Sequence, residues 1–258
     1  MPKSPEIRTP PERRAANAAR PSPAKAIPAL VMSVKRSTWR MHDENKEAAN
    51  AAYARVRMDV LRRDAFTCRY CGFTPQGDPQ AHPSSRTASG YLEVHHLDDN
   101  HHNNRPANLL TVCPFCHQVF HTGNAGHRQA ARIAWCPWLT QAEVVLLSNI
   151  AAVAIARQGR FASAGQAWFR WLEQMQTQAA QVYGDAILDV TNLGMALMAC
   201  GTSASPGWIK RAQALAPLRL VPRRDAYQAA IAWWSEHAWR AETQWDAVLG
   251  EWERACQG

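Results

Sequence analysis

The chain lacks any long hydrophobic run. Its longest apolar stretch spans 144–156, which is 13 residues, and it is interrupted by Ser148 and Asn149. A helix that crosses a membrane needs about 18 to 20 apolar residues, so we interpret this stretch as a buried helix and expect a protein that is not integral to a membrane. The first residues, MPKSP, also lack the apolar segment of a secretory signal, and none is expected.

Acidic residues are scarce at the start of the chain. The 258 residues carry a formal charge of +8, and residues 1–40 contribute +7 of it through nine basic and two acidic side chains. Seven prolines fall within the first 30 positions and no apolar periodicity is visible, which predicts a disordered basic tail. The remaining 218 residues carry only +1, so the body lacks the strong positive field of a dedicated DNA-binding protein.

Cysteine is infrequent, and four of the seven cysteines form two Cys-x-x-Cys pairs, Cys68/Cys71 and Cys113/Cys116. In a chain of this length without a signal sequence, the pattern predicts a metal site rather than a disulfide framework. Two thiolate pairs on two turns can surround one Zn²⁺ ion tetrahedrally, so we predict a structural zinc that this part of the fold requires. The other three cysteines stand alone and are interpreted as small buried hydrophobes.

Sequence patterns divide the chain into a tail (1–40), a zinc module with a lead-in helix (41–130) and a helical C-terminal domain (131–258). In the zinc module, a helix from Asp43 to about Asp64 leads into the first cysteine turn. Residues 91–97 and 109–112 are predicted strands of a hairpin, and Pro114 is expected to begin a helix.

The C-terminal part is rich in alanine and tryptophan, with ten of the 11 tryptophans after residue 130. Thr140 and Glu143 form a capping box, which predicts a helix through Ala156, whereas Ser163 and Pro222 are predicted to open further helices. The tryptophans are expected in the core, with a groove for a partner peptide as the alternative for some of them.

Histidine is concentrated in one segment, with eight of ten residues between 82 and 127. His117 and His121 are spaced i and i+4, so their imidazoles share one helix face and can hold one metal. His95 and His96 are adjacent on a predicted strand and therefore point to opposite faces, which leaves one free for another role.

The segments RRDAFTCRYCG, LEVHHLDD and ANLLTVCPFCHQVFH, between about 62 and 122, resemble an HNH (ββα-metal) nuclease module. The resemblance implies that His95, His117 and His121 bind a catalytic divalent metal (Mg²⁺, Mn²⁺, Ni²⁺ or Zn²⁺), with His96 as general base and Asn108 orienting it by a hydrogen bond. The expected fold is α+β, an HNH-like module with a four-cysteine zinc site followed by a mostly helical region. Such histidines can also be merely solvated or supporting residues, because related modules occur in proteins that cleave nothing.

A longer resemblance runs over roughly 45–240, through HHLDDNHHNN, LTQAEVVLL and LVPRRDAYQAAIAWW, and it is similar to the IcmJ/DotN family of type IVB secretion and related conjugation systems. That family implies a zinc-held adaptor at the cytoplasmic face of the inner membrane, docked on the coupling ATPase and companion subunits of the coupling complex. The intact histidines depart from the family pattern. They keep a second hypothesis open, an active metal-dependent HNH endonuclease that cuts DNA.

Overall fold

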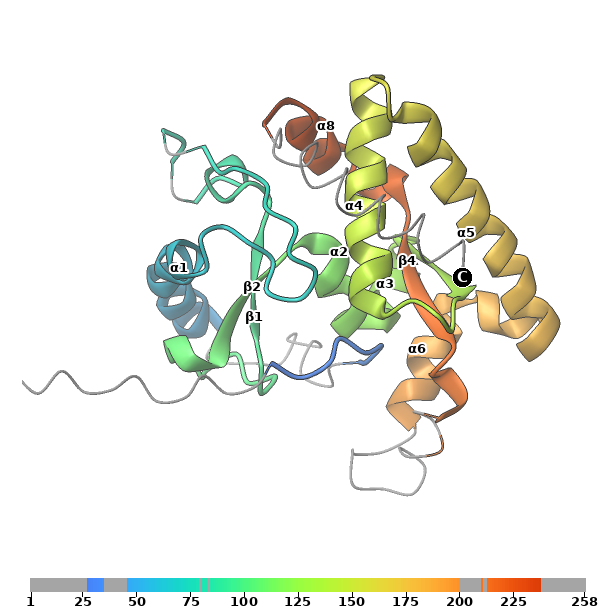
Figure 1. Ribbon diagram of the computed structural model, residues 1–258. Coiled ribbons are helices and arrows are strands. Elements are labelled where there is room, and N and C mark those ends of the chain that lie inside the picture. Colours follow the sequence, from blue (N-terminus) through green and yellow to red (C-terminus); the bar gives the residue numbers. More distant parts are fainter. Residues whose placement is uncertain are drawn as a thin grey trace, which may run out of the picture.

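The computed structural model describes residues 27–34, 46–78, 80–82, 84–199, 210 and 213–237. Most of the predicted basic tail lies outside these residues. The described residues form two antiparallel two-stranded sheets with helices packed around them (Figure 1). The prediction of a mixed helix and strand fold is therefore confirmed.

The N-terminal half is built around a β-hairpin. Helix α1 (Lys46–Arg63) leads into the loop of the first cysteine pair, and β1 (Glu93–His96) pairs with β2 (Leu109–Val112). The lead-in helix and the hairpin thus lie where the sequence predicted them. The chain continues through α2 (Pro114–His117), a 3-10 turn (Gln118–His121) and α3 (Thr122–His127). Pro114 begins α2 as predicted, because its fixed φ suits the first helical position.

The C-terminal half contains a second two-stranded sheet that the sequence did not predict. Strand β3 (Ala131–Trp135) pairs with β4 (Leu218–Pro222), and their register places Ala131 opposite Pro222. The prediction that Pro222 opens a helix is wrong, because this residue ends β4. A strand end tolerates proline, which has no N–H to donate further along the ladder.

The described helices of the C-terminal half are α4 (Gln141–Arg157), α5 (Ala162–Tyr183), α6 (Val190–Ala199) and α8 (Gln228–His237), with 3-10 turns at Asp185–Leu188 and Arg224–Tyr227. Helices α4, α5 and α6 pack against this second sheet, and α8 packs against α4.

Two of the predicted helix starts can be compared with these bounds. The capping box is confirmed, since Thr140 Oγ1 accepts from Glu143 N while the Glu143 carboxylate accepts from Thr140 N. Ser163 does not cap a helix, because it lies inside the first turn of α5.

One hydrophobic core joins the two halves, and Trp234 of α8 lies within it. Its ring is fully buried, 5.0 Å from the ring of Phe73 and 5.8 Å from that of Phe115, and its Nε1 donates to Gly90 O at 2.8 Å. Phe73 and Phe115 lie next to the two cysteine pairs in the sequence. Helix α8 therefore packs directly against the cysteine-bearing turns, although more than 100 residues separate it from them.

Candidate metal centre and histidine cleft

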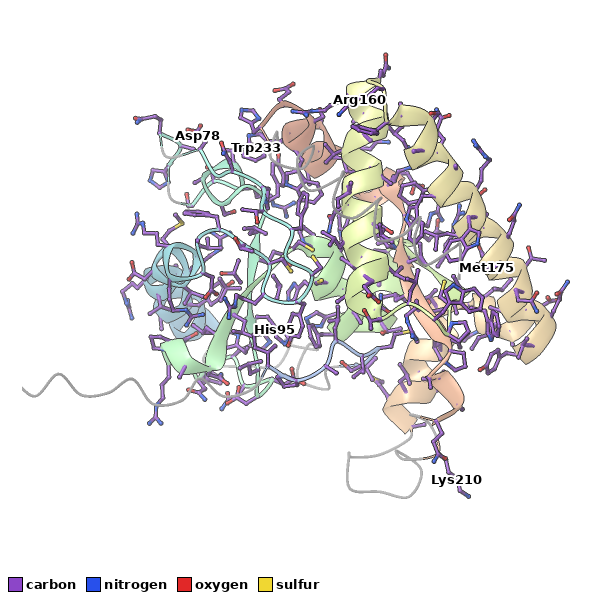
Figure 2. The ribbon with its side chains drawn as sticks, viewed as in Figure 1. Asp78, His95, Arg160, Met175, Lys210 and Trp233 are labelled. Carbon is purple, nitrogen blue, oxygen red and sulfur yellow. The ribbon has the colours of Figure 1, made fainter. Side chains whose placement is uncertain are left out.

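Two buried turns bring the four predicted cysteines together. Figure 2 draws the side chains of the described residues on the fold. The Sγ atoms of Cys68, Cys71, Cys113 and Cys116 all lie within 4.8 Å of one another, and those of Cys71 and Cys113 are 3.7 Å apart. A Zn²⁺ ion bound by four thiolates at about 2.3 Å would hold its sulfurs roughly 3.8 Å apart. This cysteine cluster is thus spaced too widely for a disulfide and fits a tetrahedral metal ion.

The first turn is closed by its own backbone. Cys68 N donates to Phe73 O and Gly72 N donates to Cys68 O, both at 2.9 Å. Gly72 has φ +77°, a left-handed conformation that glycine adopts without strain, and this allows the chain to reverse directly after Cys71. A third bond, from Arg69 N to Thr111 O, ties the turn to β2. Local backbone hydrogen bonds therefore close the first turn, and β2 anchors it.

The second turn is the start of α2. Cys113 has extended backbone at the N-cap position, and its Sγ accepts a hydrogen bond from Cys116 N at 3.4 Å. The helix then places Cys116 one turn later on the same side. Upstream, the carboxylate of Asp64 accepts from Thr111 N at 2.9 Å, which fixes the end of α1 against the strand that delivers Cys113.

Burial dominates the electrostatics of the cysteine cluster. Burial raises the pKa of Cys71 and Cys116 well above that of a free thiol, and their neighbouring sulfurs raise it further. Burial opposes ionisation of Cys68 as well, but hydrogen bonds from the other three thiols outweigh it and lower the pKa of Cys68. Burial and the charges of Cys116 and Cys68 raise the pKa of Tyr70 to about 12. Four thiolates need a compensating cation here, and a divalent zinc ion has that role in four-cysteine sites.

Asn149 is a part of this centre that sequence analysis missed. It lies on α4, is fully buried, and its Nδ2 is 3.4 Å from Cys113 Sγ and 3.9 Å from Cys71 Sγ. Hydrogen-bond donors that face metal-binding sulfurs reduce the negative charge on the sulfurs and orient them. The available signal was a polar residue inside an apolar run, which we interpreted only as evidence against a membrane span. Its neighbour Ser148 instead accepts from Trp168 Nε1 at 3.1 Å.

The histidines predicted to bind a second metal are only partly brought together. His117 and His121 meet, with their Nε2 atoms 3.3 Å apart, and His117 Nδ1 is hydrogen-bonded to Glu93 Oε2. The ring of His95 is stacked on Phe120 with centroids 4.0 Å apart and lies edge-on to His117 at 5.6 Å. Among the described residues, the cysteine cluster is the group of three or more histidine, cysteine or carboxylate ligands whose donor atoms lie within 4.8 Å of one another.

The predicted base and its predicted orienting residue lie around the turn after β1. His96 is buried, and its Nε2 lies 2.9 Å from Asn104 Oδ1. The amide of Asn108 donates to Asp98 Oδ1 at 2.8 Å and to Asn103 O at 2.9 Å, so Asn108 braces the turn that follows His96. Asn104 is therefore a contact of His96 that the sequence did not single out.

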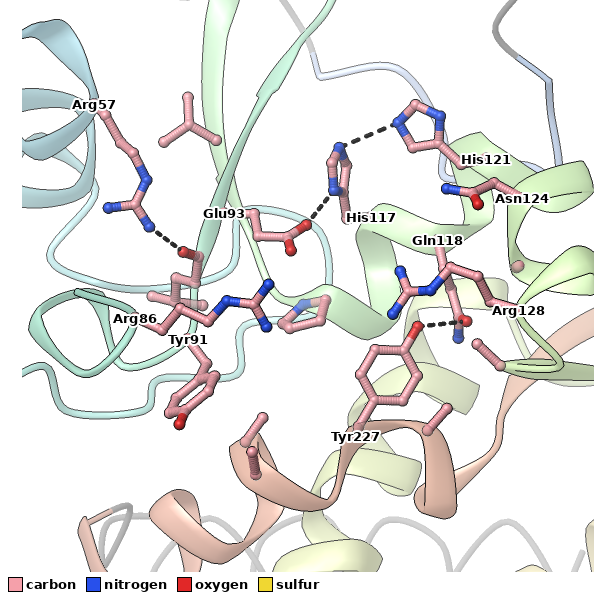
Figure 3. Close-up of a pocket in the computed structure, with 18 of the residues that line it drawn as sticks. Arg57, Arg86, Tyr91, Glu93, His117, Gln118, His121, Asn124, Arg128 and Tyr227 are labelled. Atoms are coloured by element: carbon pink, nitrogen blue, oxygen red, sulfur yellow. Dashed lines mark hydrogen bonds and ion pairs between the residues drawn. The ribbon is translucent and has the colours of Figure 1, made fainter. Parts of the chain in front are cut away.

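A cleft of about 570 Å³ runs between the histidine-bearing elements and α8 (Figure 3). Its walls include His96, His117 and His121, Glu93 lies beside His117, and Tyr227 of the C-terminal half lies opposite. Burial opposes ionisation of Glu93, but the charges of His117 and of two nearby arginines hold its pKa below the usual range. The cleft therefore contains a carboxylate held in its charged form.

The chain was compared with known proteins. No family model matches it. Among curated proteins, it is similar to the type 4 apparatus protein DotN of Legionella pneumophila, with 25% identity over 211 residues that cover 81% of this chain and 90% of DotN. Within the described residues, no helix is both long and apolar enough to cross a membrane.

Proposed function

From its place in the IcmJ/DotN family of type IVB secretion systems, which the similarity to DotN supports, we propose that the chain is a zinc-stabilised adaptor subunit of a coupling complex. The adaptor docks on the coupling ATPase and its companion subunits at the cytoplasmic face of the inner membrane. The family assigned from sequence motifs agrees with this similarity. Docking, location and the identity of the metal belong to the proposal.

The cysteine cluster is the observation that carries the adaptor proposal. All four sulfurs are buried and close enough for one metal ion. The C-terminal half contacts the same centre through Asn149 and packs beside it through Trp234. A single ion would therefore stabilise both halves as one scaffold, because binding a structural zinc contributes about 10 kcal/mol or more to folding.

An exposed aromatic surface supports a docking role. Trp138 is 59% exposed, and its ring lies 5.0 Å from that of Trp135 and 6.5 Å from that of Trp171. Exposed tryptophans commonly anchor protein interfaces because they bury a large apolar area with little loss of side-chain entropy. This surface offers one place for a companion subunit to pack.

Affinity purification from cells that express the secretion genes tests the adaptor proposal. Tagged wild-type protein and the His96→Ala variant should both recover the coupling ATPase, because assembly needs the scaffold and not an imidazole. Cys68→Ser should recover none, since it removes a metal ligand. Failure of folded, zinc-loaded wild type to recover the ATPase would overturn the proposal.

Phosphodiester cleavage is the second candidate, and it is favoured by one observation. His96, His117 and His121 line the same cleft, so a base and two ligands for a divalent metal face a common space. In this proposal His95 completes the ligand set and Asn108 fixes the turn that carries His96. Plasmid nicking with Mg²⁺, Mn²⁺ or Ni²⁺ by wild type, abolished in His96→Ala, would support it. Intact plasmid with every metal would exclude it.

A further inference from the structure

The cleft beside the histidines has an uneven charge. Its walls carry three arginines, Arg57, Arg86 and Arg128, against a single acid, Glu93. The body as a whole is nearly neutral, since residues 41–258 carry only +1. A local excess of positive charge inside a concave site attracts anionic groups more strongly than the same charges would on a flat surface.

The three arginines differ in how far they are engaged by the protein. Arg57 Nη2 donates to Ser89 Oγ at 2.9 Å and to Leu92 O at 2.8 Å, so it supports the wall. Arg86 and Arg128 are exposed, and within the described part of the chain their guanidinium groups have no hydrogen bond. Figure 3 shows them entering the cleft from opposite sides. Two guanidinium forks that face one space suit an oxyanion, which accepts paired N–H bonds.

Gln118 provides an independent indication of a missing ligand. It lines the cleft, is only 7% exposed, and accepts a hydrogen bond from Tyr227 OH through Oε1 at 2.8 Å. Burial raises the pKa of Tyr227, which keeps the phenol protonated and able to donate. Gln118 Nε2 is left buried with no hydrogen-bond partner in the described structure. A buried donor without an acceptor is costly, and a ligand oxygen entering between Arg128 and Tyr227 would satisfy it.

We propose that this cleft binds an acidic peptide segment, with one carboxylate held between Arg86 and Arg128 and reaching the amide of Gln118. The choice of a peptide as the ligand rests on the adaptor proposal, since an adaptor binds segments of partner chains. Glu93 distinguishes this ligand from a phosphate: its carboxylate repels a doubly charged phosphate more strongly than a single carboxylate, and it can accept from a peptide N–H. The cleft volume of about 570 Å³ lies within the range of ordinary ligand sites.

Fluorescence anisotropy tests the site, with a fluorescein-labelled octapeptide of alternating Glu and Ser as the probe and its Gln counterpart as the matched control. The full-length protein should bind the Glu peptide and bind the Gln peptide at least tenfold more weakly. Arg86→Gln combined with Arg128→Gln should weaken binding by at least about tenfold, as expected for lost charged hydrogen bonds. Gln118→Glu, which keeps an acceptor for Tyr227, should also weaken it.

The control variant is Arg160→Gln, which removes one positive charge from an exposed arginine beyond the end of α4 (Figure 2). It should bind the Glu peptide as wild type does. The basic N-terminal residues are present in every variant, so their contribution cancels. Circular dichroism and zinc content establish that each variant is folded.

Three outcomes would overturn the inference. These are no binding of the Glu peptide by wild type, equal binding by the double arginine variant, or displacement by inorganic phosphate at lower concentration than by unlabelled peptide. The last would assign the cleft to a phosphate-bearing ligand instead. If the peptide binds but purification fails to recover the ATPase, the cleft stands and the adaptor proposal fails. If purification recovers the ATPase but the peptide does not bind, the adaptor proposal stands and the peptide site fails.

Discussion

The cysteine cluster and the histidines are equally conspicuous in the sequence, but they differ in what holds them. The four cysteines lie on two short turns whose backbone hydrogen bonds fix each pair, and all four sulfurs converge. The histidines do not converge in this way: His95 stacks on Phe120, His96 lies beside Asn104, and His117 lies between Glu93 and His121.

This contrast between cysteines and histidines shows when the spacing of residues in the sequence is sufficient to predict a site. A Cys-x-x-Cys turn holds its ligands through the nearest backbone, so its geometry is local and follows from sequence. An imidazole at the end of a longer side chain on a strand or helix is oriented by residues that are distant in sequence. Substitutions in each group can show whether the cysteine cluster holds the fold together and whether the histidines are dispensable for it.

Loss of one cysteine from the cluster should have the largest effect. Cys113→Ser should release the metal and unfold the protein, because the loss of about 10 kcal/mol is comparable to the whole stability of a domain. Thermal unfolding by circular dichroism and metal analysis measure both effects. Cys136→Ser is the matched control, since Cys136 is fully buried but outside the cluster, and it should keep its metal. Equal metal content in the two variants would refute a role for Cys113.

A substitution beside the cluster should have an intermediate effect. Asn149→Asp replaces a donor with a carboxylate facing the sulfurs of Cys71 and Cys113, and it should weaken metal affinity about 10- to 100-fold. Competition with a chromogenic chelator measures the affinity. Ser148→Ala, one residue earlier on α4, loses the bond to Trp168 and should lower stability while leaving metal affinity unchanged. Unchanged affinity in Asn149→Asp would mean that α4 does not tune the site.

The stability that Asp64 contributes beneath the second cysteine turn should depend on pH. Burial opposes ionisation of Asp64, but hydrogen bonds from Arg63 and Thr111 N outweigh it and hold the pKa below 3.8. The depressed pKa contributes stability that is fully present above pH 3.8 and is lost as pH falls through the lower folded value. Asp64→Asn should cost about 2 kcal/mol near neutral pH. Urea unfolding of both proteins should show this difference shrinking in acid; a constant difference would contradict it.

Particular residues show how far sequence patterns reach. The cysteine cluster, the hairpin, the Thr140 capping box and the meeting of His117 with His121 follow from short spacings, and all were predicted. Pairing of β3 with β4 was missed because the two strands are remote from each other in the sequence, with helices α4, α5 and α6 between them.

Contacts between distant side chains were also missed. Asn149 appeared only as a polar interruption of an apolar run, because nothing nearby in the sequence indicates that α4 crosses the two cysteine turns. Asn104 and Asn108 both lie in an asparagine-rich turn, and spacing cannot tell which amide faces His96 and which braces Asp98.

Removal of a histidine should have the smallest effect on the scaffold. His96→Ala should leave the metal content unchanged and lower the melting temperature far less than Cys113→Ser does, because His96 is outside the cysteine cluster and its ring contacts Asn104, Tyr53 and His101 instead. Recovery of the coupling ATPase should also be unchanged. Differential scanning calorimetry on matched samples measures the stability, and a loss of bound zinc in His96→Ala would contradict the separation of the two sites.

The number of metal ions bound per chain shows whether the cysteine cluster holds its ion independently of the histidines. Native mass spectrometry and elemental analysis would count the ions bound by wild type and by a variant with His95, His117 and His121 all changed to alanine. The account predicts one zinc per chain in both proteins, held by the cysteine cluster. Absence of zinc from folded wild type, or its loss from the histidine variant, would contradict the account.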